Sequence, residues 1–208
     1  MDDGYEIISD VFPVPEVEAL AATLETLPLD RSRAGARHLL RHSSIADLSQ
    51  DARLTSIASR VLGGAARPHS ATLFDKSPRA NWLVAWHQDT TLPMRERIDL
   101  PGWGPWSEKG GVLYAHAPAS VLSRVVALRI HLDDSTSDNG ALRVLPRSHT
   151  LGVLTDDQVH DLAARSTHAT CLIGRGGVIA MRPLIVHASS KVMKDAPRRV
   201  IHIEYSTQ

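Results

Sequence analysis

Two potential metal ligands stand two residues apart at the end of an apolar run, 82–87, in this chain of 208 residues. They are His87 and Asp89. Side chains at positions i and i+2 of a β-strand point to the same face, so this imidazole and this carboxylate can bind one metal ion. Two histidines and one carboxylate with open coordination positions suit non-haem Fe(II). We predict that the third ligand is His187, much later in the chain.

A second pair with the same spacing competes for this assignment. His131 and Asp133 also stand two residues apart at the end of an apolar run, and His149 is available as a distant third ligand. The chain contains 11 histidines, so one His-x-Asp pair has little specificity. Spacing alone leaves both pairs open, and an ordinary structural role is the alternative for each histidine.

The composition limits the classes of protein to which such a site can belong. Hydrophobic residues make up 43% of the chain, enough for a sizeable core, and all-β domains of this length often form one unit. Lys plus Arg and Asp plus Glu both number 23, so no net charge attracts nucleic acid or an anionic membrane. We therefore expect a single domain over residues 1–208 whose partners are recognised by a local site.

The N-terminus and the cysteine content favour a cytoplasmic protein. The first six residues are acidic and lack the basic start and apolar centre of a signal peptide. Apolar runs stay well below the roughly 18 residues of a spanning helix. The single cysteine, Cys171, cannot form an internal disulfide and lies in an apolar run. We interpret it as a small buried side chain rather than as a reactive thiol.

Apolar periodicity predicts two helices followed by many short strands. Spacings of three and four place apolar residues on one face of 15–27 and of 50–62, and Gly63-Gly64 ends the second helix. The basic segment 31–42 is predicted to connect them. Short β-type runs divided by Pro, Gly, Asp and Asn then indicate a sandwich or barrel. These runs are 71–74, 82–87, 125–132, 141–145, 168–173, 178–181, 185–187 and 200–205.

One long segment, 92–118, lacks this pattern. It is rich in Pro and Gly and contains Trp103 and Trp106. Irregular segments of this length in a compact domain are usually functional or disordered, and two tryptophans favour a lid that packs on another part of the molecule. We therefore expect a helical part at about 1–64, a β core at about 66–206, and a lid-like insert at about 92–118.

Several short pieces follow one another in a recognisable order. They are Trp86-His87-Gln88-Asp89, Leu132-Asp133-Asp134, the run from Asn139 to His149, the run from Gly176 to Met181, His187-Ala188-Ser189 and Pro197-Arg198-Arg199. As an ordered set, these pieces resemble the phytanoyl-CoA dioxygenase family of Fe(II)- and 2-oxoglutarate-dependent oxygenases. The resemblance covers roughly residues 73–205. It implies a mainly β fold, the cupin-like double-stranded β-helix or jelly roll, with flanking N-terminal helices.

The resemblance also implies which residues bind iron. In the family, the His-x-Asp pair precedes the Leu-Asp-Asp and Asn-Gly pieces. This order implies that His87 and Asp89 are ligands together with His187, and that His131 is structural. The same family pattern places an arginine eleven residues after the second histidine, which here is Arg198. A guanidinium suits the distal carboxylate of 2-oxoglutarate, because its planar donors match two carboxylate oxygens.

Two neighbours of these residues need separate interpretation. Arg199 stands next to Arg198, but strand alternation sends the two side chains opposite ways, so only one can face the interior. Ser189 matches a position where the family often has a hydroxyl near the same carboxylate. An ordinary turn serine is the alternative for Ser189.

The activity implied by the resemblance is hydroxylation of a small organic metabolite, with conversion of 2-oxoglutarate and O2 to succinate and CO2. The metal and cosubstrate carry the difficult chemistry, while protein groups orient and shield it. Related halogenases have a small Gly or Ala where Asp89 stands, so the carboxylate here implies hydroxylation rather than halogenation. The short chain leaves little room for an acyl-CoA binding extension, which favours a small metabolite as substrate.

Aromatic and polar residues of the lid-like insert are the candidates for substrate contact. They are Trp103, Trp106, Tyr114 and His116, and a place in the core is the alternative for each. Two other functions also stay open: a cupin-like metalloenzyme that does not use 2-oxoglutarate, and a non-catalytic jelly-roll binding protein. The arginine at the expected offset opposes the first, and the complete set of ligand residues opposes the second.

Overall fold

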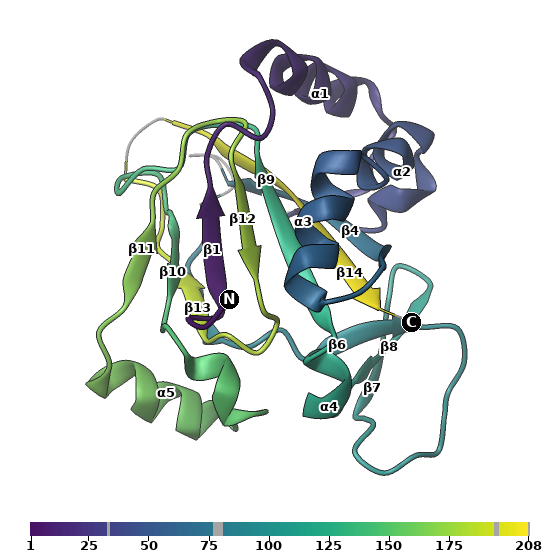
Figure 1. Cartoon of the computed structure of the whole chain (residues 1–208), viewed down its shortest axis with the longest axis vertical. Coiled ribbons are helices and arrows are strands. Elements are labelled where there is room, and N and C mark those ends of the chain that lie inside the picture. The colour runs from purple at the N-terminus through teal and green to yellow at the C-terminus, as the bar shows by residue number, and fades with distance from the viewer. Residues whose placement is uncertain (33, 77–80, 194–195, 208) are drawn as a thin grey trace.

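A computed structural model describes residues 1–32, 34–76, 81–193 and 196–207. Two antiparallel sheets form the centre of the molecule (Figure 1). The larger sheet has the order β1 (Tyr5–Ile8), β12 (Val178–Met181), β9 (Val125–His131), β14 (Arg198–Thr207), β4 (Ala66–Lys76), β3 (Gly35–Ala36), β2 (Arg31–Ser32). The smaller sheet has the order β11 (Ala169–Cys171), β10 (Leu142–Val144), β13 (His187–Ser189), β5 (Val84–His87). Each of the eight predicted β-runs overlaps one of these strands, so the mainly β prediction is confirmed.

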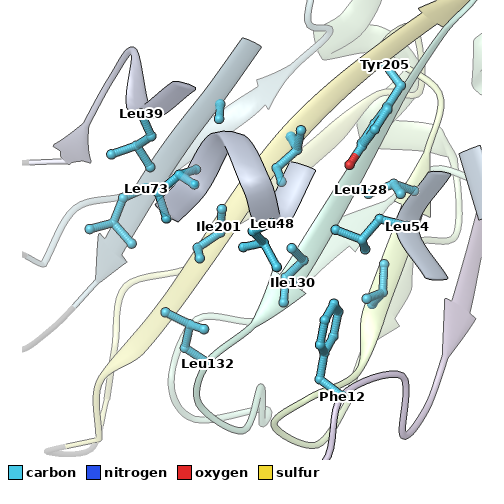
Figure 2. Packing of buried hydrophobic residues seen from close by; sticks show 14 of the residues in the cluster. Phe12, Leu39, Leu48, Leu54, Leu73, Leu128, Ile130, Leu132, Ile201 and Tyr205 are labelled. Atoms are coloured by element: carbon cyan, nitrogen blue, oxygen red, sulfur yellow. The ribbon is translucent and has the colours of Figure 1, made fainter. Parts of the chain in front are cut away.

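Helices cover the outer face of the larger sheet. They are α1 (Val14–Thr26), α2 (Ser43–Ser49) and α3 (Ala52–Leu62) (Figure 1). Figure 2 shows the apolar cluster between helices and sheet, in which Leu54 of α3 packs with Leu128 and Ile130 of β9. The Tyr205 hydroxyl crosses this layer and donates to the Ser49 carbonyl at 2.9 Å. The apolar alternation of β9 and β14 is therefore matched by the apolar faces of the helices.

The predicted helices begin and end within two residues of the positions expected, for identifiable reasons. The Asp51 carboxylate caps α3 by accepting a hydrogen bond from the Arg53 backbone N–H at 2.8 Å. Gly63 ends the helix at φ 71°, a left-handed conformation that favours glycine. The prediction of a helical part over 1–64 is correct only in part, because the strands β1, β2 and β3 also lie in it.

The prediction that 92–118 lacks regular structure is wrong. This segment contributes to a third sheet with the order β6 (Thr91–Met94), β8 (Val112–His116), β7 (Trp106–Lys109) (Figure 1). The strands are four or five residues long and mostly exposed or half-buried, so they carry little apolar alternation. The short helix α4 (Ala119–Leu122) follows them, and α5 (Asp156–Arg165) follows the 3-10 turn Ser148–Leu151.

The space between the two main sheets is apolar at one end and polar at the other. Leu142, Ile179, Met181 and Cys171 belong to the apolar part. Cys171 is fully buried, and burial raises the pKa of its thiol to about 12, which confirms its interpretation as a buried side chain. The polar part contains buried Lys76, Arg129, His131, Arg198 and His202. Charged residues are rarely buried unless they serve a site, so the polar part is where a functional site is expected.

Candidate metal centre

His87 and His187 are brought together by strand pairing. They are direct cross-strand partners between β5 and β13, and their ring centroids lie 4.2 Å apart. Asp89 follows β5, and its backbone N–H donates to the Pro183 carbonyl at 2.9 Å. Two neighbouring strand ends of the smaller sheet therefore present all three side chains at one point.

The three side chains form a compact donor set. Nε2 of His87 lies 3.7 Å from one carboxylate oxygen of Asp89, and Nε2 of His187 lies 3.5 Å from the other. The three potential ligand atoms all lie within 4.8 Å of one another. Two imidazoles and one carboxylate at such separations suit a divalent transition metal.

Backbone carbonyls fix the orientation of both imidazoles. Nδ1 of His87 lies 2.8 Å from the Ala85 carbonyl oxygen, and Nδ1 of His187 lies 2.9 Å from that of Ile185. A carbonyl can only accept, so each Nδ1 carries the proton and each Nε2 keeps its lone pair. This arrangement, in which the second ring nitrogen donates to a backbone carbonyl, is usual for histidines that bind metals.

The protonation states also favour metal binding. Burial lowers the pKa of His187 to about 4, against the opposing influence of the nearby Asp89 carboxylate. Burial alone would raise the pKa of Asp89, but the neighbouring His187 and His87 hold it below its usual value. A neutral imidazole and an ionised carboxylate are the forms that coordinate a metal ion.

Gln88, between the two ligands in sequence, points away from them and anchors the strand end. Its amide nitrogen donates to the carbonyls of Gly152 at 2.9 Å and Leu184 at 2.7 Å. Its amide oxygen accepts from the Leu154 N–H at 2.8 Å. Three bonds from one side chain thus fix the backbone that carries His87 and Asp89.

A cavity of about 80 Å³ adjoins the three potential ligands, and cationic side chains line it. Lys76 at the end of β4 is fully buried, and its Nζ donates to the Ser189 hydroxyl at 2.7 Å and to the Ser190 carbonyl at 2.6 Å. Arg198 at the start of β14 donates from Nη2 to the same hydroxyl at 3.3 Å. Ser189 therefore joins two cations beside the metal centre.

Arg129 of β9 supplies a third cation to this cavity. Its Nη1 lies 3.1 Å from Nδ1 of His202, and its Nε has no hydrogen-bond partner within the described chain. The same holds for Nε and Nη1 of Arg198, although both are buried. Burial, the main cause, and the nearby Arg129 lower the pKa of Arg198 to about 9. Unpartnered buried donors of this kind fit an anionic ligand with several oxygen atoms.

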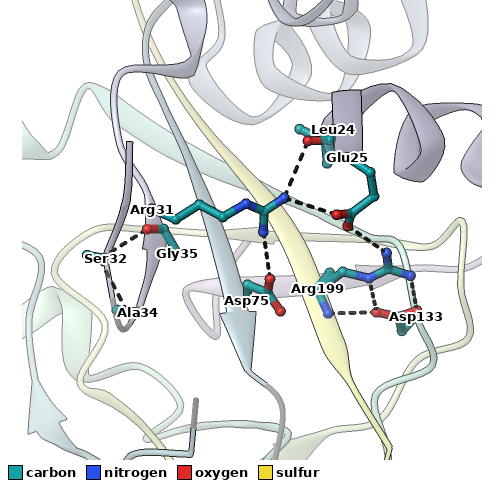
Figure 3. Close-up of polar contacts among 9 residues, drawn as sticks. All are labelled: Leu24, Glu25, Arg31, Ser32, Ala34, Gly35, Asp75, Asp133 and Arg199. Atoms are coloured by element: carbon teal, nitrogen blue, oxygen red, sulfur yellow. Dashed lines mark hydrogen bonds and ion pairs between the residues drawn. The ribbon is translucent and has the colours of Figure 1, made fainter. Parts of the chain in front are cut away.

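Arg198 and Arg199 point to opposite sides of β14, as alternation requires. Figure 3 shows Arg199 on the outer side, where its Nε and Nη2 donate to both carboxylate oxygens of Asp133, each at 2.9 Å. Glu25 of α1 lies between Arg199, at 3.6 Å, and Arg31. Arg199 thus belongs to the surface ion pairs, and Arg198 is the arginine that faces the cavity.

The competing His131 pair is not assembled as a metal site. Asp133 pairs with Arg199, and His149 packs against Gly4 near the N-terminus. His131 is buried, and its ring nitrogens have no hydrogen-bond partner in the described residues. In the part of the chain that the structure describes, His87, Asp89 and His187 are the group that could hold a metal ion.

The four candidate substrate residues do not line the small cavity. Trp103 packs against the apolar cluster that contains Leu92 and Leu122, which fits the core alternative. Trp106 lies against Arg97 at 5.9 Å, and His116 is exposed, with Nδ1 2.7 Å from the Thr90 hydroxyl. Tyr114 is buried and lines a separate cavity of about 270 Å³.

Lys76, Arg129 and Gln88 were missed by sequence reasoning. Lys76 and Arg129 sit in strands with no motif around them, and only the pairing of both strands with β14 brings them to Arg198. A lysine that ends a strand and an arginine within the apolar run 125–130 were the available signals, because buried charges need a reason.

Comparison with protein families gives one match that spans most of the chain. The family described as phytanoyl-CoA dioxygenase (PhyH) matches residues 1–200. A comparison with curated proteins found no match.

Several solved structures share the fold at low sequence identity. AviO1 from Streptomyces viridochromogenes Tue57 is 23% identical with a TM-score of 0.71, over 99% of this chain and 90% of that one. EctD from S. alaskensis with bound Fe is 21% identical with a TM-score of 0.74, and the match covers 99% of this chain and 73% of that one. HygX from Streptomyces hygroscopicus, with nickel and 2-oxoglutarate bound, is 18% identical with a TM-score of 0.68, and the match covers 100% of this chain and 84% of that one.

Proposed function

The chain belongs to the phytanoyl-CoA dioxygenase family, and on this premise we propose that it is an Fe(II)- and 2-oxoglutarate-dependent dioxygenase that hydroxylates a small organic molecule. Its cosubstrates are 2-oxoglutarate and O2, and its coproducts are succinate and CO2. The EctD structure with bound Fe supports the choice of metal, and the HygX structure with nickel and 2-oxoglutarate bound supports the choice of cosubstrate.

The single observation that carries this assignment is the position of buried cations beside the donor set. Arg198, Lys76 and Arg129 line the same cavity as His87, Asp89 and His187. A cupin-like metalloenzyme without an oxo-acid cosubstrate needs the donor set but not the cations. A dicarboxylate cosubstrate explains both, because one end can reach the metal while the other offsets the buried positive charge.

Each residue of the chain then has a defined task. His87, Asp89 and His187 hold Fe(II) through two Nε2 atoms and a carboxylate oxygen. Arg198 and the Ser189 hydroxyl bind the distal carboxylate of 2-oxoglutarate, and Lys76 orients Ser189 and adds positive charge. When bound, Fe(II) and 2-oxoglutarate supply the oxidation of a C–H bond by O2.

Apolar side chains also contribute to this site. Val84 and Leu142 line the same cavity as the cations and the candidate ligands. A water-poor cavity strengthens the attraction between Arg198 and a carboxylate, because the local dielectric is low. The protein therefore orients the cosubstrate and limits side reactions with solvent.

Anaerobic titration with Fe(II) and 2-oxoglutarate tests the assignment. We expect a visible metal-to-ligand charge-transfer band in the wild type and no band in His87→Ala or His187→Ala. Arg198→Ala should raise the Kd for 2-oxoglutarate by about 100-fold, since an Arg–carboxylate pair in a buried site contributes about 2–5 kcal/mol. Arg199→Ala is the matched control and should bind 2-oxoglutarate as the wild type does, because Arg199 faces Asp133.

A wild-type protein that takes up Fe(II) but forms no band with 2-oxoglutarate would exclude the cosubstrate. Equal weakening by Arg198→Ala and Arg199→Ala would exclude the specific role of Arg198. Succinate formation without any added organic substrate, dependent on Fe(II), would support the enzyme over a non-catalytic binding protein.

A further inference from the structure

The inner face of β14 continues beyond the metal centre toward a second charged residue. Ile201, Ile203 and Tyr205 face the helices, while Arg198 and His202 face the interior. Glu204 is two residues beyond His202 and therefore shares the inner face. At about 3.3 Å per residue, Glu204 lies about 7 Å past His202, whereas Arg198 lies about 13 Å before it. The cosubstrate cations and Glu204 are thus at opposite ends of one strand face.

A β-bulge next to Glu204 adds a further inward side chain. The pairing of β14 with β4 shifts after Glu204, which pairs with Ser70, while Tyr205 pairs with Pro68. The extra residue is His69, and bulges often re-aim side chains beside functional sites. Both ring nitrogens of His69 are buried without a hydrogen-bond partner among the described residues. The bulge therefore leaves a polar ring without a protein partner close to Glu204.

A cavity of the described structure adjoins this position. It measures about 470 Å³ and is lined by His69, by Ser206, two residues past Glu204, and by Leu92, three residues past Asp89. Its other walls combine apolar side chains, such as Met94, Val121 and Val125, with Arg124, Ser120 and Thr207. This size and lining are typical of a site for a small organic molecule. In strand order, Glu204 stands between the metal centre and this cavity.

The half-buried carboxylate of Glu204 forms no ion pair within the described residues, although Ser70 hydrogen-bonds to it and the charge of Arg37 acts on it. Burial, the main cause, and repulsion by Asp89 raise its pKa to about 7, while Ser70 and Arg37 act in the opposite direction. A half-buried carboxylate without a counter-ion is costly, so a cationic ligand placed there would gain a strong, charge-assisted hydrogen bond.

We propose that Glu204 recognises the substrate, binding an ammonium, amidinium or guanidinium group of a small molecule whose apolar body occupies the cavity of about 470 Å³. This inference rests on the proposed function, because it places that molecule beside the metal centre. The neutral ring of His69 is positioned to bind a second polar group of the same molecule. Glu204 is then a specificity-determining residue, and the enzyme selects amines over their neutral analogues.

Benzamidinium and benzamide are suitable probes, since they have nearly the same shape and differ in charge. Calorimetric titration of the whole chain at pH 8, anaerobically with Fe(II) and 2-oxoglutarate, measures both Kd values. We expect the wild type to bind benzamidinium at least about tenfold more tightly, the effect of about one charge-assisted hydrogen bond. Glu204→Gln should bring the two Kd values within about twofold of each other, and Glu204→Asp should keep part of the preference.

Glu96→Gln is the matched control, because Glu96 is exposed and lies outside both cavities. It should keep the wild-type preference. Equal affinity of the wild type for both probes overturns the inference, as does a preference that survives in Glu204→Gln. If circular dichroism shows that Glu204→Gln does not fold, Glu204→Asp serves as the test instead. A preference for benzamidinium that is smaller than in the wild type then supports the inference, and an unchanged preference overturns it.

The charge-transfer titration of the wild type separates this inference from the proposed function. A preference for benzamidinium that depends on Glu204, in a protein without the band, would leave the cation site standing and remove the cosubstrate. A charge-transfer band without a preference for benzamidinium would support the cosubstrate and overturn the cation site at Glu204.

Discussion

Three buried cations around one serine create a local imbalance of charge. Lys76 and Arg198 both donate to the Ser189 hydroxyl, and Arg129 lines the same cavity. Burial, the main cause, and the positive charge of Arg198 and Arg129 lower the pKa of Lys76 to about 7. The ligand-free site therefore holds Lys76 in balance between its charged and neutral forms near neutral pH. A bound dicarboxylate would favour the charged form.

The titration of Lys76 predicts how stability depends on pH. Between pH 7 and the usual pKa of 10.5, the unfolded chain keeps a proton on Lys76 that the folded chain has lost. The free energy of unfolding should therefore rise with pH in this window. From pH 7 to pH 9, we expect the ligand-free wild type to gain about 1–2 kcal/mol relative to Lys76→Met, measured by urea unfolding.

Lys191→Met controls for the loss of a lysine from the surface, because Lys191 is exposed and close in sequence to Ser189. It should show the same pH dependence as the wild type. Parallel curves for the wild type and Lys76→Met would contradict the prediction.

At the scale of elements, the candidate metal centre depends on hydrogen bonds that fix the ends of β5 and β13 and join β5 to the chain that precedes β13. The carbonyls of Ala85 and Ile185 orient the imidazoles, and Gln88 joins the end of β5 to Gly152, Leu154 and Leu184. The ligands are therefore held by backbone that is itself hydrogen-bonded. Such outer partners commonly change metal affinity 10–100-fold when they are lost.

Replacement of Gln88 should weaken the metal site without touching a ligand. In Gln88→Ala, we expect the Kd for Fe(II), or for Co(II) as a spectroscopic substitute, to rise by about tenfold or more. Gln158→Ala is the matched control, because Gln158 also binds backbone, closing the capping box of α5 with Thr155. It should lower stability by about 1 kcal/mol and leave the Kd unchanged. Equal Kd values for wild type and Gln88→Ala would contradict the role of Gln88.

At the scale of the molecule, the helices and the larger sheet share one apolar cluster. Leu24 of α1, Leu48 of α2 and Leu54 of α3 are buried in the same cluster as Leu128 and Ile203 of the sheet. Neither layer can bury its apolar face alone, so we propose that residues 1–208 fold as one domain. Within the described residues, no helix is long and apolar enough to cross a membrane.

A substitution in the helical layer should therefore destabilise the whole molecule. Leu54 is fully buried, and Leu54→Ala should lower the free energy of unfolding by about 2–5 kcal/mol. Calorimetry should show a single transition moved to lower temperature. Leu151→Ala is the control, because this side chain is 55% exposed, and it should change the transition temperature little. Two separate transitions, with only one affected by Leu54→Ala, would contradict a single domain.

The sequence predicted those parts in which local pattern and burial agree. β9 and β12 are buried throughout and mostly apolar, so the sequence predicted both, and it predicted α3 because its capping signals and apolar face coincide. The third sheet was missed because β7 is a short polar strand. The candidate metal ligands came from the His-x-Asp spacing and from the order of pieces that resembles the family, since spacing alone left His131 and Asp133 open. Lys76 did not, because its contact with Ser189 spans 113 residues and arises from sheet pairing alone.

The shortness of β13 bears on which heritable changes the enzyme can tolerate. Its three residues pair with β10 so that His187 and Ser189 share one face and Ala188 takes the other. Deleting Ala188 or inserting a residue next to it would break the i, i+2 spacing, so that His187 and Ser189 could no longer both face the cavity. If the proposed roles hold, point mutations could change iron binding and cosubstrate binding separately, whereas length changes in this strand could not. Natural variation in length should be confined to the loops on either side.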